Sequence, residues 1–313
     1  MLNSAFALTF ADLYTTEGAA RVDAAFVAGL READAVLVER LAAARAAPAE
    51  LSRKDESTLL IDVAPYVEDF LAQLFDIGPE VRALQARHHA LAPLFAVKRQ
   101  FVQRKAMNAY KADAAAAIDG PALRTGLDAM LGAPVGVKAF ELAFAEAVSA
   151  WQRDDAAHTT ELDVATRYAA WAAHTSAGKA LHKGGTLFRA PRKLDMLKLV
   201  PIAPVDLNGL RALRLADDHP LRRREGFALT DRGTDFEGGL AEAHYCIWCH
   251  EQGKDSCAHG LPEKKPADGS VPDNPYKKSV FGVTLAGCPL EEKISEFHKL
   301  RAEGWAIGAL AVI

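Results

Sequence analysis

The sequence has no cysteine in its first 245 residues, and all four cysteines of the 313-residue chain lie near its end: Cys246, Cys249, Cys257 and Cys288. The N-terminus has no basic region ahead of a long apolar stretch, so we expect no secretory signal peptide. The chain has no uncharged apolar run of about 18 residues, so we expect no membrane span. These absences predict a cytoplasmic protein, and in that reducing compartment clustered cysteines bind metal more often than they form disulfides.

Motifs of several common enzyme classes are also missing. The chain contains no G-x-G-x-x-G dinucleotide fingerprint, no P-loop, no H-E-x-x-H motif and no G-x-S-x-G motif. Its formal net charge is −4, so no basic field indicates a nucleic-acid partner. The adjacent His88 and His89 would lie on different faces of one helix, and we expect one to pack and the other to lie at the surface.

The composition favours helices. Alanine is abundant and the β-branched and aromatic residues that favour strands are sparse, which predicts an all-α fold without convincing strands. Apolar residues recur at helical spacing through residues 1–186, which we interpret as a multi-helix N-terminal domain of unassigned role. Thr15 is a candidate N-cap, and Gly78-Pro79 and Asp119-Gly120-Pro121 indicate points where helices restart.

Residues 187–236 have a different character, with basic residues and prolines interspersed. We interpret this stretch as an irregular basic connector. Its simplest interpretation is a solvated segment with local ion pairs. The functional alternative is a docking segment for an acidic partner, a phosphate-bearing cofactor or nucleic acid.

Residues 237–313 contain the cysteines and form the third expected unit. Residues 261–279 are rich in proline and charge, which predicts an exposed loop. We expect a helix to begin at Pro289, with Glu291 in its first turn, and to stop at Gly304. The apolar run that follows ends without a cap, which predicts a packed terminal element or a domain truncated at its C-terminus.

The cysteine spacing admits several interpretations. Cys246 and Cys249 form a C-x2-C pair, the usual first half of a zinc or iron–sulfur site. The clustering disfavours four unrelated buried thiols, and the expected compartment disfavours disulfides. The C-x-x-C-H string that ends at His250 is typical of covalent haem attachment, which would require export and leave two cysteines without a role. A structural zinc site, in which His244, His250 or His259 can replace a thiolate, stays open.

An iron–sulfur cluster would use all four cysteines as thiolate ligands. The last cysteine is followed by Pro289, as in the ferredoxin cysteine run. Gly282 and Gly287 would let the backbone approach the cluster, and Trp248 and Phe281 would shield it from water. A helix beginning at Pro289 would direct its positive end at the cluster and raise its reduction potential.

A longer pattern at the end of the chain has three segments: Gly287-Cys-Pro-Leu, a helix carrying Ile294, Glu296 and Phe297, and Gly304-Trp305. This pattern resembles the N-terminal iron–sulfur domain of the glutamate synthase small subunit, which also occurs in dihydropyrimidine dehydrogenase and related flavin oxidoreductases. Ser295 stands where that family has proline. The resemblance is confined to residues 237–313 and leaves the helical body unassigned.

The resemblance implies that one [4Fe–4S] cluster is bound by four ligands: Cys246, Cys249, Cys257 and Cys288. It also implies a flavin-containing oxidoreductase domain or subunit as partner, with FAD and NAD(P)H bound on that missing part. The two longer gaps between cysteines depart from the family, so residues 260–279 would be an insertion. We therefore predict an electron-transfer module of an oxidoreductase, with a helical scaffold carrying a structural four-cysteine zinc site as the alternative.

Overall fold

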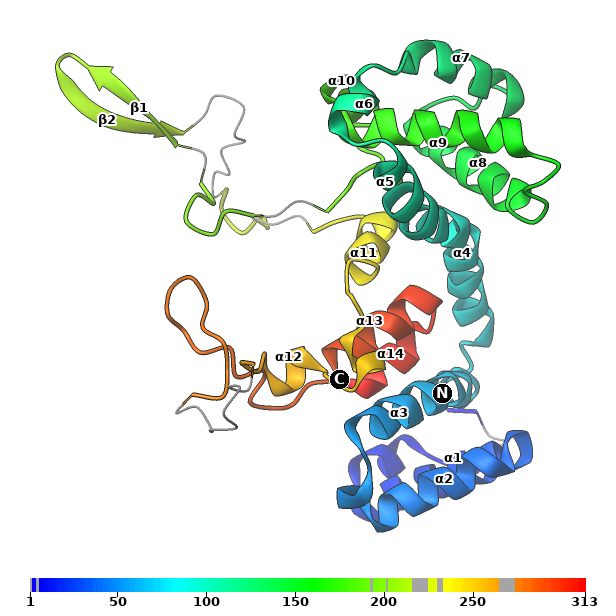
Figure 1. The fold of residues 1–313 in the computed structure, drawn as a ribbon. Helices are drawn as coiled ribbons and strands as arrows, with labels where there is room; N and C mark the ends of the chain where they lie inside the picture. Colours follow the sequence, from blue (N-terminus) through cyan, green and yellow to red (C-terminus); the bar gives the residue numbers. More distant parts are fainter. Residues whose placement is uncertain are drawn as a thin grey trace.

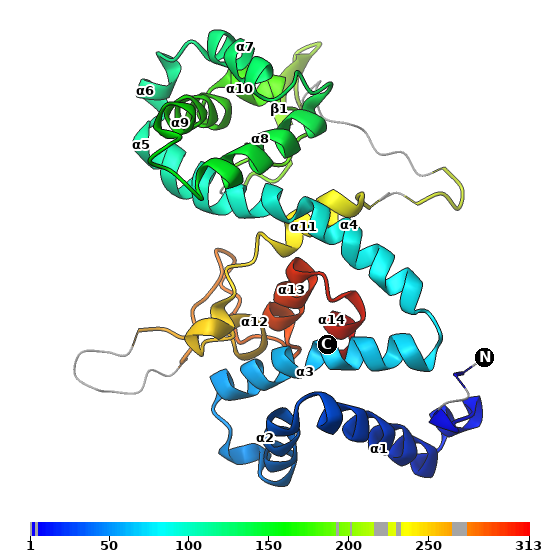
Figure 2. The same cartoon turned by 90° about the vertical axis from the view of Figure 1, so that its right-hand side faces the viewer.

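The computed structural model describes residues 2–3, 6–191, 194–200, 202–215, 225–229, 233–264 and 274–313. Two groups of helices lie at the two ends of the long helix α4 (Gly78–Val97), and the C-terminal helices lie between these groups (Figure 1; Figure 2). The segment with the cysteines begins between these groups at α11 (Phe236–Ala243), and α12 (Ser256–His259) with the loop after it extends outward from the helical body (Figure 1).

The N-terminal group is a helical hairpin that packs on a third helix. Its elements are the 3-10 helix η2 (Phe10–Tyr14), α1 (Thr16–Ala33), α2 (Ala35–Ala46), the 3-10 helix η3 (Pro48–Glu50) and α3 (Arg53–Leu74). Side chains of Thr15, Asp34 and Ser52 cap α1, α2 and α3 by accepting backbone N–H groups. A small core of buried apolar residues holds the group together: Phe26, Leu30, Leu37, Val38 and Leu59.

The column that begins with α4 continues without a break through η4 (Lys98–Ala106) and α5 (Met107–Ala109). The segment η4 is a π-helix, in which each N–H bonds five residues back and the turn is wider than in an α-helix. It buries Phe101, Val102 and Ala106 in the main core. His88 of α4 is buried and His89 is exposed, as expected from their adjacency.

The second helical group contains the main core. Its elements are α6 (Ala112–Ala116), α7 (Gly120–Met130), α8 (Val137–Trp151), α9 (Thr159–His174) and α10 (Ser176–Leu181). Helix α9 is its centre, with Tyr168 fully buried against the rings of Phe140 and Phe144. Asp119 caps α7, so the predicted restart at this position is confirmed.

The connector contains the only β-hairpin in the described residues. Strands β1 (Ile202–Leu207) and β2 (Leu210–Leu215) pair in antiparallel register around Asn208 and Gly209, which both have positive φ. That turn is the primed type that Asn-Gly favours. The hairpin projects away from the body (Figure 1), and most of its residues are exposed on both faces. Neither face is buried, so apolar and polar residues do not alternate and the strands were not predicted. The basic residues Arg192, Lys193 and 222–224 lie outside the described residues.

The C-terminal part comprises α11 (Phe236–Ala243), the 3-10 helix η5 (Cys249–Gln252), α12 (Ser256–His259), α13 (Ile294–Glu303) and α14 (Ala306–Val312). Helices α13 and α14 both contact α3, and Leu300 and Ala309 are buried with Ala64 in a separate small core. The buried carboxylate of Glu68 on α3 accepts the N–H groups of Ile307 and Gly308, at 2.7 and 3.0 Å. The apolar end of the chain therefore packs as a terminal helix.

One expected helix boundary is wrong. Helix α13 begins at Ile294, not at Pro289, because Glu291 has a φ of +52° and its N–H bonds to the Cys288 carbonyl in a turn. Leu290 is accordingly exposed instead of joining the buried stripe. The stop at Gly304 is confirmed, with this residue in the left-handed C-cap conformation.

The all-α prediction is confirmed, since the described chain is mostly helical with one small hairpin. Among the described residues, no helix is both long enough and apolar enough to span a membrane. The domain limits at 186 and 236 stay predictions.

Candidate metal centre

The four cysteines lie in the segment that leads from α11 to α13 (Figure 1). Cys246 follows α11, Cys249 begins η5, Cys257 lies in α12, and Cys288 directly precedes the turn before α13. All four thiols are free. The structure therefore distributes the predicted ligands over four short segments of the chain.

The C-x2-C pair forms a tight turn whose backbone N–H groups point at sulfur. Trp248 is in the left-handed conformation, with a φ of +53°, and its N–H donates to the Cys246 Sγ at 3.4 Å. The N–H of Ser256 donates to the Cys249 Sγ at 3.2 Å. Such N–H donors stabilise the thiolate form of cysteine, which is the form that binds metal.

The two isolated cysteines are joined through their backbones. The N–H of Cys288 donates to the Cys257 carbonyl at 2.8 Å, although the long loop separates them in sequence. Gly260 and Gly287 make this approach sterically feasible. A Cβ on Gly287 would lie 2.4 Å from the Ala258 carbonyl oxygen, and one on Gly260 would lie 2.6 Å from the Ala286 carbonyl carbon. Both glycines also have positive φ, which side-chain-bearing residues rarely adopt.

The loop between Cys257 and Cys288 closes by backbone pairing in its described parts. Leu261 donates to the Leu285 carbonyl at 2.9 Å, and Leu285 donates to the Lys277 carbonyl at 2.8 Å. Residues 265–273 of the predicted exposed loop lie outside the described residues. Nothing lies within 4 Å of a Cβ placed on Gly282, and Phe281 is 63% exposed. Their expected roles beside a cluster stay predictions.

The thiols differ in their surroundings. Cys249 is buried, Cys246 and Cys288 are half-buried, and Cys257 is exposed as a residue. The protein packed around its thiol nevertheless raises the pKa of Cys257 by desolvation, and negative charge on Cys249 and Cys246 raises it further. The N–H of the preceding residue, Ser256, donates to the Cys249 Sγ, so Cys257 lies beside the first pair.

The side chains do not converge on a single point. Among the described residues, no group of three or more His, Cys, Asp or Glu side chains is placed to hold one metal ion. A zinc ion needs four ligand atoms about 2.0–2.3 Å from its centre. The present side-chain positions do not meet that requirement, for the cysteines alone or with His244, His250 or His259 added.

A buried polar layer lies beneath the first cysteine pair and ties it to α13 and α3. The Ser295 hydroxyl contacts the Cys246 Sγ at 3.9 Å and the His250 Nδ1 at 2.6 Å. The next residue, Glu296, is fully buried and accepts the Ser57 hydroxyl of α3. Burial lowers the pKa of His250, although the negative charge of Glu296 opposes this effect. Ser295 therefore joins the cysteine turn to the helical body.

The side of the first pair nearest the α4–η4 column is covered by cations and an indole ring. The Arg99 guanidinium lies 4.2 Å from the centroid of the Trp248 ring and donates to the Cys246 carbonyl at 3.3 Å. The Lys299 ammonium lies 5.2 Å from the same ring. The expected shielding role of Trp248 is consistent with this half-buried position. Arg99 was not predicted to belong to the site, because nothing in the sequence places it near a residue so distant along the chain.

The helix-dipole expectation for the cluster is not met. Because α13 begins at Ile294, the segment after Cys288 has no helix N-terminus at Pro289 to direct at the thiolates. The positive charge near the site comes from Arg99 and Lys299 instead.

The sequence did not indicate the buried hydrogen-bonded triad of Glu141, His182 and Tyr168. The Glu141 Oε1 lies 2.9 Å from the His182 Nδ1, and the Tyr168 hydroxyl lies 2.8 Å from the His182 Nε2. The second oxygen of Glu141 accepts the N–H groups of Thr186 and Leu187, both at 2.7 Å. Burial raises the pKa of Tyr168 to about 12, so its hydroxyl stays protonated at neutral pH. The triad fixes the chain where it leaves α10.

The chain matches known sequences over nearly its whole length. Residues 4–76 match the family described as "RP005 N-terminal alpha-helical domain". The chain is 30% identical over 305 residues to "Uncharacterized protein RP005" of Rickettsia prowazekii (strain Madrid E), which covers 95% of this chain and 98% of the relative. No solved structure matches the chain.

These matches contradict the expected membership in the iron–sulfur domain family of the glutamate synthase small subunit. That resemblance used a short string around Cys288 and the helix after it, and the structure starts this helix five residues later than expected. The similarity to the Rickettsia protein instead includes the helical body that the resemblance left unassigned. The flavin partner, FAD and NAD(P)H were expected from the resemblance alone and remain untested.

Proposed function

The chain belongs to the family of the Rickettsia protein RP005, and within this family we propose a function from the chain's own residues: its four cysteines bind an iron–sulfur cluster that transfers electrons. The ligands would be Cys246, Cys249, Cys257 and Cys288. The proposal rests mainly on the 2.8 Å hydrogen bond from the Cys288 N–H to the Cys257 carbonyl. That contact brings Cys257 and Cys288 together, and the Ser256 N–H that donates to the Cys249 Sγ at 3.2 Å places Cys257 beside the C-x2-C pair.

The donor set fits an iron–sulfur cluster by its chemistry. All four ligands are free thiols, and the sulfurs of Cys246 and Cys249 already accept backbone N–H groups. Hydrogen bonds to cysteine sulfur are a main determinant of cluster potential. In a cluster each thiolate binds a different iron, so the four sulfurs lie farther apart than around one ion.

A bound cluster would supply one-electron transfer, and the surrounding residues would tune it. Arg99 places positive charge beside Trp248, which favours the more negative reduced state and raises the potential, whereas the charge of Lys299 is offset by its ion pair with Glu251 at 2.9 Å. Such thiolate chemistry suits a reducing compartment, so we assign the protein to the cytoplasm.

The experiment is metal and sulfide analysis of protein purified without oxygen. We expect iron, acid-labile sulfide and broad visible absorbance that bleaches on reduction with dithionite. Cys257→Ser and Cys288→Ser should each lose most of the iron and sulfide. Val280→Ser is the matched control, because it introduces serine at an exposed position of the same loop and should leave the iron content unchanged.

A structural zinc site on the same cysteines is the second candidate, and the contact between Cys246 and Ser295 of α13 favours it. A zinc ion there would fasten α11 to α13. Zinc without iron or sulfide in the anaerobic protein would select this candidate. If the protein contains neither zinc nor iron, both functions are wrong. Cys288→Ser separates the two roles. Loss of a structural zinc ligand should lower the stability alone, whereas loss of a cluster ligand should abolish electron transfer while the fold is retained.

A further inference from the structure

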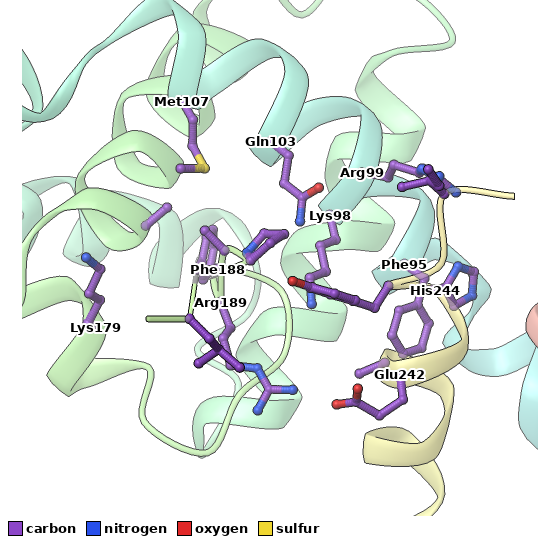
Figure 3. A pocket seen from close by; sticks show the side chains of 17 residues that line it. Phe95, Lys98, Arg99, Gln103, Met107, Lys179, Phe188, Arg189, Glu242 and His244 are labelled. Carbon is purple, nitrogen blue, oxygen red and sulfur yellow. The ribbon is translucent and has the colours of Figure 1, made fainter. Parts of the chain in front are cut away.

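A cavity of about 850 Å³ lies between the π-helix η4, the segment that follows α10, and α11 (Figure 3). Lys98 and Gln103 of η4 point into it, and Arg189 and Glu242 face it from the other two segments (Figure 3). Its volume is in the range of small-molecule sites. The cavity lies beside the cysteine segment, because Tyr245 and Ile247 also line it.

The lining is unbalanced in charge. Its cationic side chains are Lys98, Arg99, Lys179 and Arg189, and its one carboxylate is Glu242. Four positive groups therefore face one negative group inside a partly desolvated space, an arrangement that favours an anionic occupant.

Lys98 is the central cation of this arrangement. Among the described residues its ammonium makes no hydrogen bond or ion pair of its own. Burial, together with the positive charge of Arg189, lowers the pKa of Lys98 to about 8, and the carboxylates of Glu141, Glu242 and Glu237 offset only part of this lowering. Glu141 already accepts His182 and two backbone N–H groups, so it is not available as a partner.

Arg99 retains unused donor capacity at the cavity edge. Its Nη2 donates to the Cys246 carbonyl, whereas its Nη1 is buried without a partner in the described structure. A buried donor without an acceptor destabilises the protein. An anion in the cavity would provide acceptors for such donors.

The backbone of η4 explains why these side chains share one face. Lys98 and Gln103 are five residues apart, a spacing that would turn them roughly 140° from each other in an α-helix. The i→i+5 bonding of the π-helix widens the turn and brings both to the cavity, with Met107 one turn farther on. Residues Phe101 and Val102 face the core on the opposite side. Such local widening is frequent at functional sites.

We propose that this cavity binds a small molecule with an anionic oxygen group, a phosphate or a carboxylate, between Lys98 and Arg189. The apolar part of the molecule would pack against Met107, Phe188 and Leu194, which line the same space. The Glu141 carboxylate is a positioning group for this site, because it holds the N–H groups just ahead of Phe188 and Arg189. This inference does not depend on metal at the cysteines.

The test is isothermal titration calorimetry on the full chain at low ionic strength with three probes. Phenyl phosphate and phenylacetate carry the two candidate anions on the same apolar ring, and benzyl alcohol is the neutral counterpart. We expect the preferred anion to bind at least about tenfold more tightly than the other and benzyl alcohol not to bind. The proposal is overturned if neither anion binds, or if the neutral probe binds as well as the anions.

Two variants that each remove one positive charge from η4 show whether anion binding depends on the cavity or on the overall charge of the helix. Lys98→Gln should weaken binding of the preferred anion by about tenfold or more, as expected for loss of a charged hydrogen bond. Arg104→Gln lies on the exposed side of η4 and should leave binding unchanged. An equal loss in both variants would indicate diffuse attraction instead of a site. Lys98→Gln should not lower the melting temperature of the free protein, and a lower value would identify Lys98 as a structural residue and refute the proposal.

Discussion

Gly287→Ala should separate the two isolated cysteines and lower metal content. Gly287 has a φ of +92°, and its added Cβ would lie 2.4 Å from the Ala258 carbonyl oxygen and 2.5 Å from the Gly260 nitrogen. Both neighbours are backbone atoms and cannot rotate away, so the segments carrying Cys257 and Cys288 must move apart. The hydrogen bond of 2.8 Å between these cysteines would then be strained or lost.

A matched control in the same loop separates the conformational and the steric contributions to the loss of stability in Gly287→Ala. Gly282 also has positive φ, +77°, but nothing lies within 4 Å of its added Cβ. Gly282→Ala should therefore cost only the conformational penalty of about 1–2 kcal/mol. Gly287→Ala should cost this amount plus about 1–3 kcal/mol for the steric overlap.

Urea denaturation of both variants measures these losses in the free energy of unfolding. Iron analysis of the same anaerobic preparations measures the metal content. We expect Gly287→Ala to lose most of its iron and Gly282→Ala to retain it. Equal stability and equal iron content in the two variants would refute the close approach of the cysteine segments as the basis of the site. Far-UV circular dichroism should show retained helices in both, because neither glycine lies in a helix.

Three further changes test the frame around the site. Glu68→Gln should lower the free energy of unfolding by about 1–3 kcal/mol, because it removes the charge that binds two N–H groups of α14, whereas the exposed Glu39→Gln should change it by less than about 0.5 kcal/mol in the same urea titration. Glu141→Ala should lower the free energy of unfolding by about 2–5 kcal/mol and abolish anion binding in the cavity. Glu146→Ala, on the exposed side of α8, should do neither. Unaltered anion binding by Glu141→Ala in calorimetry would contradict the positioning role of Glu141. Burial lowers the pKa of His88, so the unfolded state binds a proton below pH 6.5 that the folded state does not, and stability should fall as pH decreases from 7 to 5. Thermal melts of His88→Leu should show a flatter dependence over this range, and an unchanged slope would contradict burial of a neutral His88.

Local signals in the sequence located much of the helical frame. The Thr15 hydroxyl accepts the Gly18 N–H as an N-cap, α4 begins at Gly78, and Gly304 ends α13. Each of these positions is decided by backbone conformation or capping within a few residues, so a short window of sequence contains the relevant physics. The same reasoning failed at Pro289, because a contact with Cys257, distant in sequence, holds the following residues in a turn.

The candidate sites depended on contacts between distant segments. The Asn208-Gly209 pair was a usable signal for the hairpin, but the exposed strands around it lack the alternation that one buried face imposes. The cysteines were visible as residues, whereas their approach depends on the paired loop and on Gly260 and Gly287. The cavity could not be predicted, because three segments contribute to it and a π-helix has no simple periodic pattern in sequence.

The anchoring of the cysteine segment bears on what its thiols are for. Small zinc modules fold only with metal because they have no sufficient core. Here the Lys293 ammonium bonds to the Glu56 carboxylate at 2.7 Å, Glu296 accepts Ser57, and Leu300 is fully buried in a core shared with α3. None of these contacts involves a cysteine sulfur, so α13 and α14 do not need a metal to hold their positions. A site that the fold does not require for its stability is more consistent with electron transfer than with a structural metal site.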